Sequence, residues 1–414
     1  MAALNASRRR VVVTARGLVS PLGDTPGAFA AALEEGRSGL GPSALATWNG
    51  CAAVVAGEVW GFAPETYFGD RNVRPLDRTS RLAAAAAGLA LAEAGLAQVE
   101  SRTQPVGLVL GTQFGSLKTI AEFDRRGLTA GPNYVKPLDF ANSVINAPAG
   151  QTAIWHGLVG LNSTMAGGAT AGLAAIGHAT DLIRGGHAEA LLAGGAEELS
   201  PEAGLTYGRA GLLAAAGSSP VPFGAGRRGF ALGEGAALVL LEELEGARAR
   251  GASLFGEVVG HASAFDPSMG QDPWSAASAL GRAVRAAFAD AGLGPGDLGA
   301  VVTGGSGSLE LDLAEALGLA SSLEEAAEAV PATAIKGALG EAFGASGGFQ
   351  ALALLEILSS GRLPGIGGLG EPEPGLALSL SNRPRAVNAR TVLATALGLD
   401  GHAAALILTR SDAA

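Results

Sequence analysis

Side chains that could act as nucleophiles or bases are scarce in this sequence of 414 residues, which holds one cysteine and five histidines. Cys51 lies in Trp-Asn-Gly-Cys-Ala-Ala, where no neighbour would favour its thiolate, so we expect an unreactive thiol. The histidines are His156, His178, His187, His261 and His402. No two of them have a metal-ligand spacing with a third donor nearby, and we expect neither a metal nor a cofactor.

The remaining candidates for chemistry lie in two glycine-rich segments. Gly304-Gly-Ser-Gly-Ser follows an apolar run but lacks the Lys-Ser/Thr pair that a phosphate-binding loop requires. Asp312 and Glu315, three residues apart, would share one face of a helix. The second segment begins at Lys336 and contains Glu341. With no histidine beside it, Lys336 fits a structural ion pair better than a catalytic base.

The elements that would position these residues alternate between apolar strands and Ala-rich helices, which predicts a layered α/β fold. Strands are expected at Arg10 to Ala15, Val106 to Leu110, Ala188 to Ala193, Ala236 to Glu242, Leu254 to Gly260, Gly299 to Thr303 and Ala403 to Leu408. Helices are expected at Gly27 to Glu35, Thr79 to Ala94, Ala171 to Arg184, Ser275 to Ala291 and Gly347 to Ser360.

The two halves of the sequence resemble each other. Ala94-Gly95-Leu96 closes an Ala-rich helix ahead of an apolar strand, and Ala291-Gly292-Leu293 does the same later in the chain. The repetition predicts two duplicated halves, residues 1–250 and 251–414. Chance similarity between Ala- and Leu-rich segments is the alternative.

Composition narrows the range of partners and compartments. A hydrophobic content of 48% can supply a substantial core, and a net charge of −10 argues against nucleic acid as a partner. The apolar part of the N-terminal segment is too short for a signal peptide. No uninterrupted apolar stretch approaches the length of a membrane span, so we expect no membrane association and a cytoplasmic location.

Four segments, in this order, resemble the β-ketoacyl synthase branch of the thiolase superfamily: Arg10 to Gly23, Gly160 to Gly172, Pro222 to Ala236 and Lys336 to Gly348. The last is similar to the family signature Lys-x-x-x-Gly-His-x-x-Gly-Ala-x-Gly. The resemblance covers nearly the whole chain. It implies a five-layered αβαβα fold built from two duplicated halves, usually in an obligate dimer.

The resemblance also identifies three positions where the family carries its reactive groups. A condensing enzyme uses a cysteine to hold the acyl chain and two histidines to support decarboxylation of the extender. The matching positions here are Ala169, Gly304 and Glu341. A carboxylate at Glu341 would repel both a malonyl group and the enolate formed from it. The sequence therefore predicts a chain that does not condense.

A fourth departure lies close to the C-terminus. The family carries a Phe-Gly-Phe-Gly-Gly loop beside its acyl-binding site, and here that loop reads Leu397-Gly-Leu-Asp-Gly401. The aromatic gate is lost and a carboxylate, Asp400, is gained. This change is expected of a site that never forms an acyl enzyme.

Some relatives that lack the cysteine serve as partner subunits of active ketosynthases and are called chain-length factors in type II polyketide systems. The resemblance implies a heterodimer with an active ketosynthase, served by an acyl carrier protein. It places a tunnel wall at Phe114, Leu117, Ile120 and Ala121, and the dimer interface at Phe140, Val144 and Asn146. Plain packing is the alternative for each of these residues.

Two other functions remain open from the sequence. The chain could be an acyltransferase or malonyl-thioester decarboxylase that uses Thr170, Glu341 or His402 on the same fold. It could also be a ketosynthase-like subunit that only stabilises its partner. Many aromatic-polyketide chain-length factors carry glutamine at the cysteine position, and Ala169 departs from that pattern, which puts an initiating decarboxylation in doubt.

Overall fold

The computed structural model describes residues 8–47, 55–98, 104–215, 218, 220–268 and 273–411, so Cys51 lies outside the described chain. Its main sheet has ten strands in the order β11-β10-β14-β15-β9-β1-β8-β6-β4-β5. The strands of one half are β1 (Val11–Val19), β4 (Val106–Thr112), β5 (Asn162–Ala166), β6 (Ala190–Glu197) and β8 (Gly235–Glu243). Those of the other half are β9 (Gly256–Phe265), β10 (Ala300–Thr303), β11 (Ala332–Ala334), β14 (Thr391–Leu397) and β15 (His402–Thr409).

Strand pairing repeats between the two halves. In the first half β4 lies parallel to β5 and β6, and β8 runs antiparallel to both β6 and β1. In the second half β10 lies parallel to β11 and β14, and β15 runs antiparallel to both β14 and β9. A short β1–β9 pairing joins the two sets. The matching order supports a duplication, while the boundary expected at residue 250 stays a prediction.

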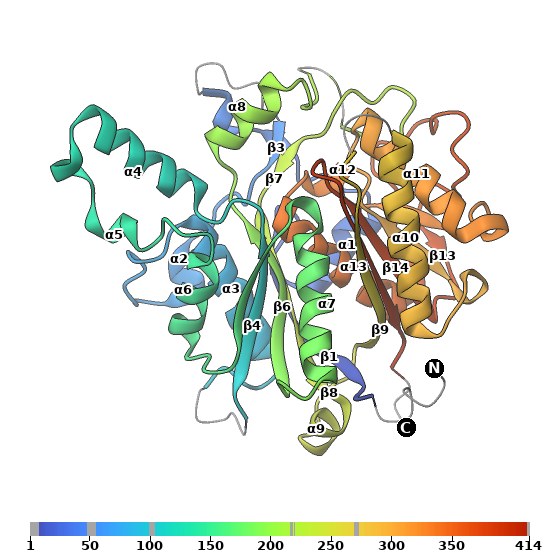
Figure 1. Ribbon diagram of the computed structural model, residues 1–414, viewed down its shortest axis with the longest axis horizontal. Coiled ribbons are helices and arrows are strands. Elements are labelled where there is room, and N and C mark those ends of the chain that lie inside the picture. The colour runs from blue at the N-terminus through green and yellow to red at the C-terminus, as the bar shows by residue number, and fades with distance from the viewer. Residues whose placement is uncertain are drawn as a thin grey trace.

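Helices cover both sets of strands and fill the space between them, which gives five layers (Figure 1). α3 (Arg78–Glu93) and α6 (Ala147–His156) cover the outer face of the first set. α7 (Ala171–Arg184) and α13 (Ser346–Ser360) pack between the two sets. α10 (Pro273–Ala291) and α11 (Leu309–Leu323) cover the outer face of the second set. The predicted thiolase-like fold is therefore confirmed.

The middle layer is tightly packed because it carries small residues where backbones meet. A Cβ built on Gly172 of α7 would lie 2.6 Å from the carbonyl oxygen of Gly344, and one built on Gly347 would lie 2.3 Å from the backbone nitrogen of Leu173. Any side chain at either position would push the two central helices apart. This close approach brings the N-terminal ends of α7 and α13 together, which places the turn before α7 beside residues 343–347.

Every strand and helix predicted above is present, with ends shifted by a few residues. Shorter elements complete the chain: α1 (Pro26–Glu34), α2 (Pro64–Phe68), α4 (Leu117–Thr129), α5 (Pro137–Phe140), α8 (Pro201–Arg209), α9 (Leu244–Ala249), α12 (Lys336–Leu339), β2 (Gly41–Pro42), β3 (Val55–Gly57), β7 (Leu232–Gly233), β12 (Arg362–Leu363) and β13 (Arg385–Ala386). α4 and α5 project from the layered body (Figure 1). Across the described residues, no helix combines the length and apolarity that a membrane span needs.

Candidate functional site

The turn between β5 and α7 holds Ala169, the first of the three positions that the sequence resemblance matches to the family's reactive groups. Residues Gly168–Thr170 form a short 3-10 helix that leads directly into α7, and Ala169 lies at its centre, buried. Its methyl group offers no nucleophile at the place where the helix N-terminus would favour an anion. The neighbouring Thr170 hydroxyl donates to the carbonyl oxygen of Gly167 at 2.7 Å. That hydroxyl is thus already engaged with the backbone.

Gly304 follows β10 and is the second position. Its backbone nitrogen donates to Glu315 Oε1 at 2.7 Å, and the same oxygen accepts from Thr395 Oγ1 at 2.6 Å. A Cβ built on Gly304 would lie 3.0 Å from the carbonyl oxygen of Thr395 and 3.1 Å from Ala396 Cα. Neighbouring backbone would have to move to admit an imidazole at this position.

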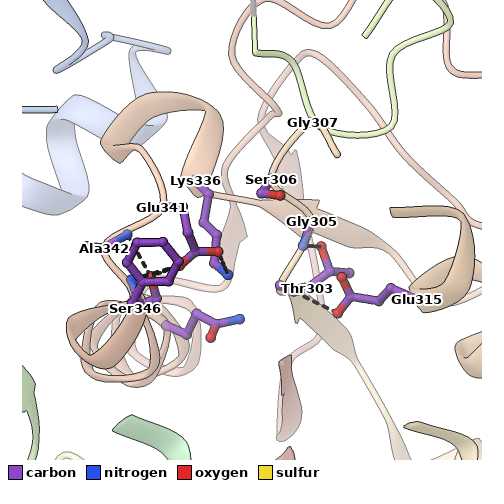
Figure 2. Close-up of polar contacts among 12 residues, drawn as sticks. Thr303, Gly305, Ser306, Gly307, Glu315, Lys336, Glu341, Ala342 and Ser346 are labelled. Carbon is purple, nitrogen blue, oxygen red and sulfur yellow. Dashed lines mark hydrogen bonds and ion pairs between the residues drawn. The ribbon is translucent and has the colours of Figure 1, made fainter. Parts of the chain in front are cut away.

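Glu341 is the third position, and its carboxylate has a full set of donors. Oε2 accepts from Lys336 Nζ at 2.6 Å, while Oε1 accepts from the backbone nitrogen of Phe343 and from Ser346 Oγ, each at 2.8 Å (Figure 2). Glu341 and Lys336 are only 5% and 3% exposed. The predicted structural ion pair at Lys336 is confirmed. It also offsets the charge of Glu341, so the repulsion predicted for this carboxylate is largely neutralised.

Carboxylates on α11 anchor the loop that follows Gly304. Asp312 accepts from the backbone nitrogens of Phe223, Ser306 and Gly307, and Arg227 lies 3.6 Å away. Burial raises the pKa of Asp312 to about 6 and that of Glu315 to about 7. Both side chains are fully buried on one helix face; Asp312 is bonded to backbone nitrogens, and Glu315 is bonded to the backbone of Gly304 and the hydroxyl of Thr395. They hold the loop rather than offer a free carboxylate site.

A cavity of about 340 Å³ lies where these segments meet. Its walls are Gln113, Phe114, Ala166, Gly167, Gly168, Ala169, Tyr207, Phe230, Ser306, Leu311, Glu341, Phe343, Leu397, Leu399 and Asp400. One wall is aromatic: the Phe114 ring packs edge-on against Phe343 at 5.7 Å, and the Tyr207 ring stacks on Phe343 at 5.1 Å. Ala169 and Glu341 line this cavity, and Gly304 is not among its lining residues.

The predicted tunnel residues separate into two groups. Phe114 lines the cavity, packed against Phe343 and Tyr207. Leu117, Ile120 and Ala121 are partly exposed on α4, a helix in which no residue is buried, and they are absent from the cavity wall. In the single chain these three side chains therefore face outward, and their place in a tunnel stays a prediction.

The predicted interface residues lie on an exposed apolar surface. Phe140 is 65% exposed and Val144 is 53% exposed, and Asn146 is exposed beside them. Leu138, Ile145, Ile154 and Val159 are exposed along the same segment. β5, which follows, is the last strand of the sheet, and β4 is its one strand partner within the described chain.

Two residues of the site, Glu197 and Tyr207, were not predicted. Glu197 is buried at the end of β6 and accepts from Thr112 Oγ1 and from the backbone nitrogens of Gln113, Phe114 and Gly344. Burial raises its pKa to about 7. Its carboxylate links the turn that carries Phe114 to the segment after Glu341. Glu197 could have been identified from the Glu-Glu pair at the end of an apolar strand. Carboxylates are rarely buried unless donors surround them, so such a pair indicates a hydrogen-bonded site.

Tyr207 was also missed. Its ring forms part of the aromatic wall, and its hydroxyl accepts from Gln113 Nε2 at 2.7 Å. No pattern in the sequence connects α8 with the turn after β4. His402, an alternative catalytic group, lies outside the cavity wall, with Nδ1 3.1 Å from Asp400 Oδ2 and its ring against Phe265.

Known proteins match the chain along most of its length. The family described as β-ketoacyl synthase, N-terminal domain, matches residues 8–247, and β-ketoacyl synthase, C-terminal domain, matches residues 255–369. The 3-oxoacyl-(acyl-carrier-protein) synthase 2 of Synechocystis sp. is 30% identical over 404 residues, covering 96% of this chain and 97% of the relative. Actinorhodin polyketide β-ketoacyl synthase 2 of Streptomyces coelicolor is 32% identical over 407 residues, covering 97% and 98%.

Two solved structures share the fold throughout. The ishigamide ketosynthase/chain length factor aligns with a TM-score of 0.91 at 28% identity, covering 97% of this chain and 99% of the other. A β-ketoacyl synthase from Burkholderia phymatum STM815 aligns with the same TM-score at 29% identity and the same coverage.

Proposed function

Because the chain belongs to the β-ketoacyl synthase family, we propose that it is a non-catalytic chain-length factor. In this proposal it pairs with an active ketosynthase in a cytoplasmic type II polyketide synthase and closes the far end of the tunnel that receives the growing chain. The partner supplies the cysteine and the histidines, and an acyl carrier protein delivers extender units to the pair.

One observation carries the proposal: the three positions that the family uses for chemistry hold Ala169, Gly304 and a fully engaged Glu341. Ala169 cannot form a thioester, because a methyl group is not a nucleophile. Neither Gly304 nor Glu341 presents a donor to a developing enolate, since one has no side chain and the other is an acceptor bound to Lys336. A retained fold without its reactive groups favours a role in assembly and shape.

The exposed apolar segment, residues 138–146, supports the proposal that another protein chain binds here. Phe140 and Val144 are exposed, and β5 is the last strand of the sheet. Contiguous apolar side chains and an unpaired strand edge are unfavourable in water and are commonly covered by another protein. A ketosynthase of the same fold would present a related surface, so the two chains could extend one sheet across the interface.

The proposed role in closing the tunnel depends on the volume of the side chains that form its wall. Phe114 lines the cavity, while Leu117 begins α4 and Ile120 lies about one helical turn further along, where a partner would face them. A packed wall yields little, so a larger side chain there removes space from the growing chain. Each carbon of an extended chain occupies about 1.3 Å, on bond geometry like that of the backbone. A change from leucine to phenylalanine is therefore large enough to exclude a two-carbon unit.

The experiment is to reconstitute the complex with its ketosynthase and measure product length by mass spectrometry. Phe114→Ala should lengthen the products, and Leu117→Phe and Ile120→Phe should shorten them by at least one two-carbon unit. Leu128→Phe, the same change at an 87% exposed position near the end of α4, is the matched control. Unchanged products from all three tunnel variants, in complexes that remain active, would leave only a stabilising role for this chain.

A further inference from the structure

The turn between β14 and β15 carries Asp400. Its carboxylate lies against the elbow, the turn between β5 and α7 that contains Gly168 and Ala169. Asp400 lines the cavity, and a Cβ built on Gly168 would lie 3.3 Å from its Oδ2. The turn is held by backbone hydrogen bonds between Gly398 and its neighbours, and Oδ1 of Asp400 accepts from the backbone nitrogen of His402 at 3.2 Å. The carboxylate is thus fixed at the cavity mouth rather than free to swing away.

Charges around the cavity are unbalanced. Among its described lining residues, Glu341 and Asp400 are the charged ones, and both are negative. Lys336 offsets Glu341 from behind the wall. Within the described parts of the chain, the ion-pair partner of Asp400 is His402, and an imidazole is positive only when protonated. Burial raises the pKa of Tyr207 to about 12, and the nearby charges of Glu341, Glu197 and Asp400 add to that rise. The cavity is therefore a region of negative potential.

We propose that this cavity admits uncharged groups and rejects groups that carry a free carboxylate, such as malonyl, and that Asp400 makes the selection. A carboxylate that enters would meet Asp400 at the mouth, between apolar side chains such as Leu399 and Phe114 that screen charge poorly. An alkyl or acyl group would meet no such repulsion. The inference goes beyond the proposed function, because it concerns the cavity of this chain alone and requires no partner.

A thiol placed at the elbow can report on this selection. Ala169→Cys puts a sulfur atom on the cavity wall, where its thiolate displaces iodide from either iodoacetamide or iodoacetate. The two reagents have nearly the same size and differ in charge. Both rates are measured on the full-length chain at about pH 8, where an ordinary imidazole is neutral. Cys51 is replaced by serine in every variant, so both reagents react with one thiol, and the ratio of their rates does not depend on the thiolate fraction.

The expected result is a low iodoacetate-to-iodoacetamide ratio in Ala169→Cys, relative to a small neutral thiol. Adding Asp400→Asn, which keeps the shape and removes the charge, should raise the iodoacetate rate about fivefold, as expected for charges a few ångströms apart at a partly exposed site. The iodoacetamide rate should change less than about twofold. Glu328→Gln, an exposed carboxylate beyond the far end of α11, should leave the ratio unchanged.

Two outcomes would overturn the inference. If Asp400→Asn leaves the iodoacetate-to-iodoacetamide ratio unchanged, the charge of Asp400 does not exclude carboxylate groups from the cavity. If the thiol reacts with neither reagent while the denatured chain reacts with both, the cavity is closed by shape rather than by charge. Neither outcome bears on pairing with a ketosynthase, so the proposed function stands or falls separately.

Discussion

The buried ion pair between Lys336 and Glu341 leads to a prediction that separates a structural carboxylate from a catalytic one. Glu341→Gln removes the negative charge but keeps an oxygen that can accept from Phe343 and Ser346. The Lys336 ammonium, 3% exposed, would then be left in the core without the partner that now lies 2.6 Å away. We therefore expect a large loss of stability from a nearly isosteric change.

The magnitude follows from the geometry. Two unit charges about 4 Å apart attract by about 4 kcal/mol at an effective dielectric constant of about 20. Removal of one partner of a buried pair typically costs about 3–5 kcal/mol. Glu315 also lies within electrostatic range of Lys336 and would offset part of the loss. We expect the free energy of unfolding to fall by about 3 kcal/mol.

Urea denaturation of the purified chain, followed by circular dichroism, measures this change. The double variant Lys336→Met with Glu341→Gln should recover most of the loss, because no unpaired charge remains. Glu122→Gln, which breaks two exposed ion pairs on α4, should leave the unfolding curve unchanged. A cost below about 1 kcal/mol for Glu341→Gln, or a double variant no more stable than the single one, would refute the reasoning.

Two further predictions concern the interface and the buried carboxylates. Phe140→Asp combined with Val144→Asp should abolish co-purification with the ketosynthase, because two charges would enter an apolar contact; a complex of unchanged size by gel filtration would contradict this. Burial, reinforced by Asp77, raises the pKa of Glu198 from 4.5 to about 8, so the folded state favours its protonated form. Stability is then lost as pH rises through that range, and Glu198→Gln should flatten the fall in unfolding free energy between about pH 5 and pH 8.

Much of the fold could be predicted because its strands are apolar runs with clear ends. Val106 to Leu110 and Ala236 to Glu242 were correctly placed, since buried strands read as continuous hydrophobic stretches. β14 (Thr391–Leu397) was missed, although it is fully buried, because Thr391 and Thr395 interrupt its apolar pattern. Both threonines are buried, and Thr395 finds its acceptor on α11, far away in the sequence.

The site could be predicted only in part. Ala169 and Glu341 were placed by motif spacing, and the structure puts both on one cavity. Tyr207 and Glu197 were not found, because their importance depends on contacts between β6, α8 and the turn after β4 that no local pattern encodes. The outward position of Leu117 on α4 also shows the limit of helical spacing, which predicts a shared face but not what that face contacts.

The most direct test of the non-catalytic assignment is the intact mass of each subunit after the complex meets an acyl carrier protein loaded with an acyl group. We predict one acyl adduct on the ketosynthase and none on this chain, because Ala169 has no nucleophile and the Thr170 hydroxyl is bonded to the backbone. An acyl adduct on this chain that disappears in Thr170→Val would contradict the account, because the chain would then carry out acyl transfer itself.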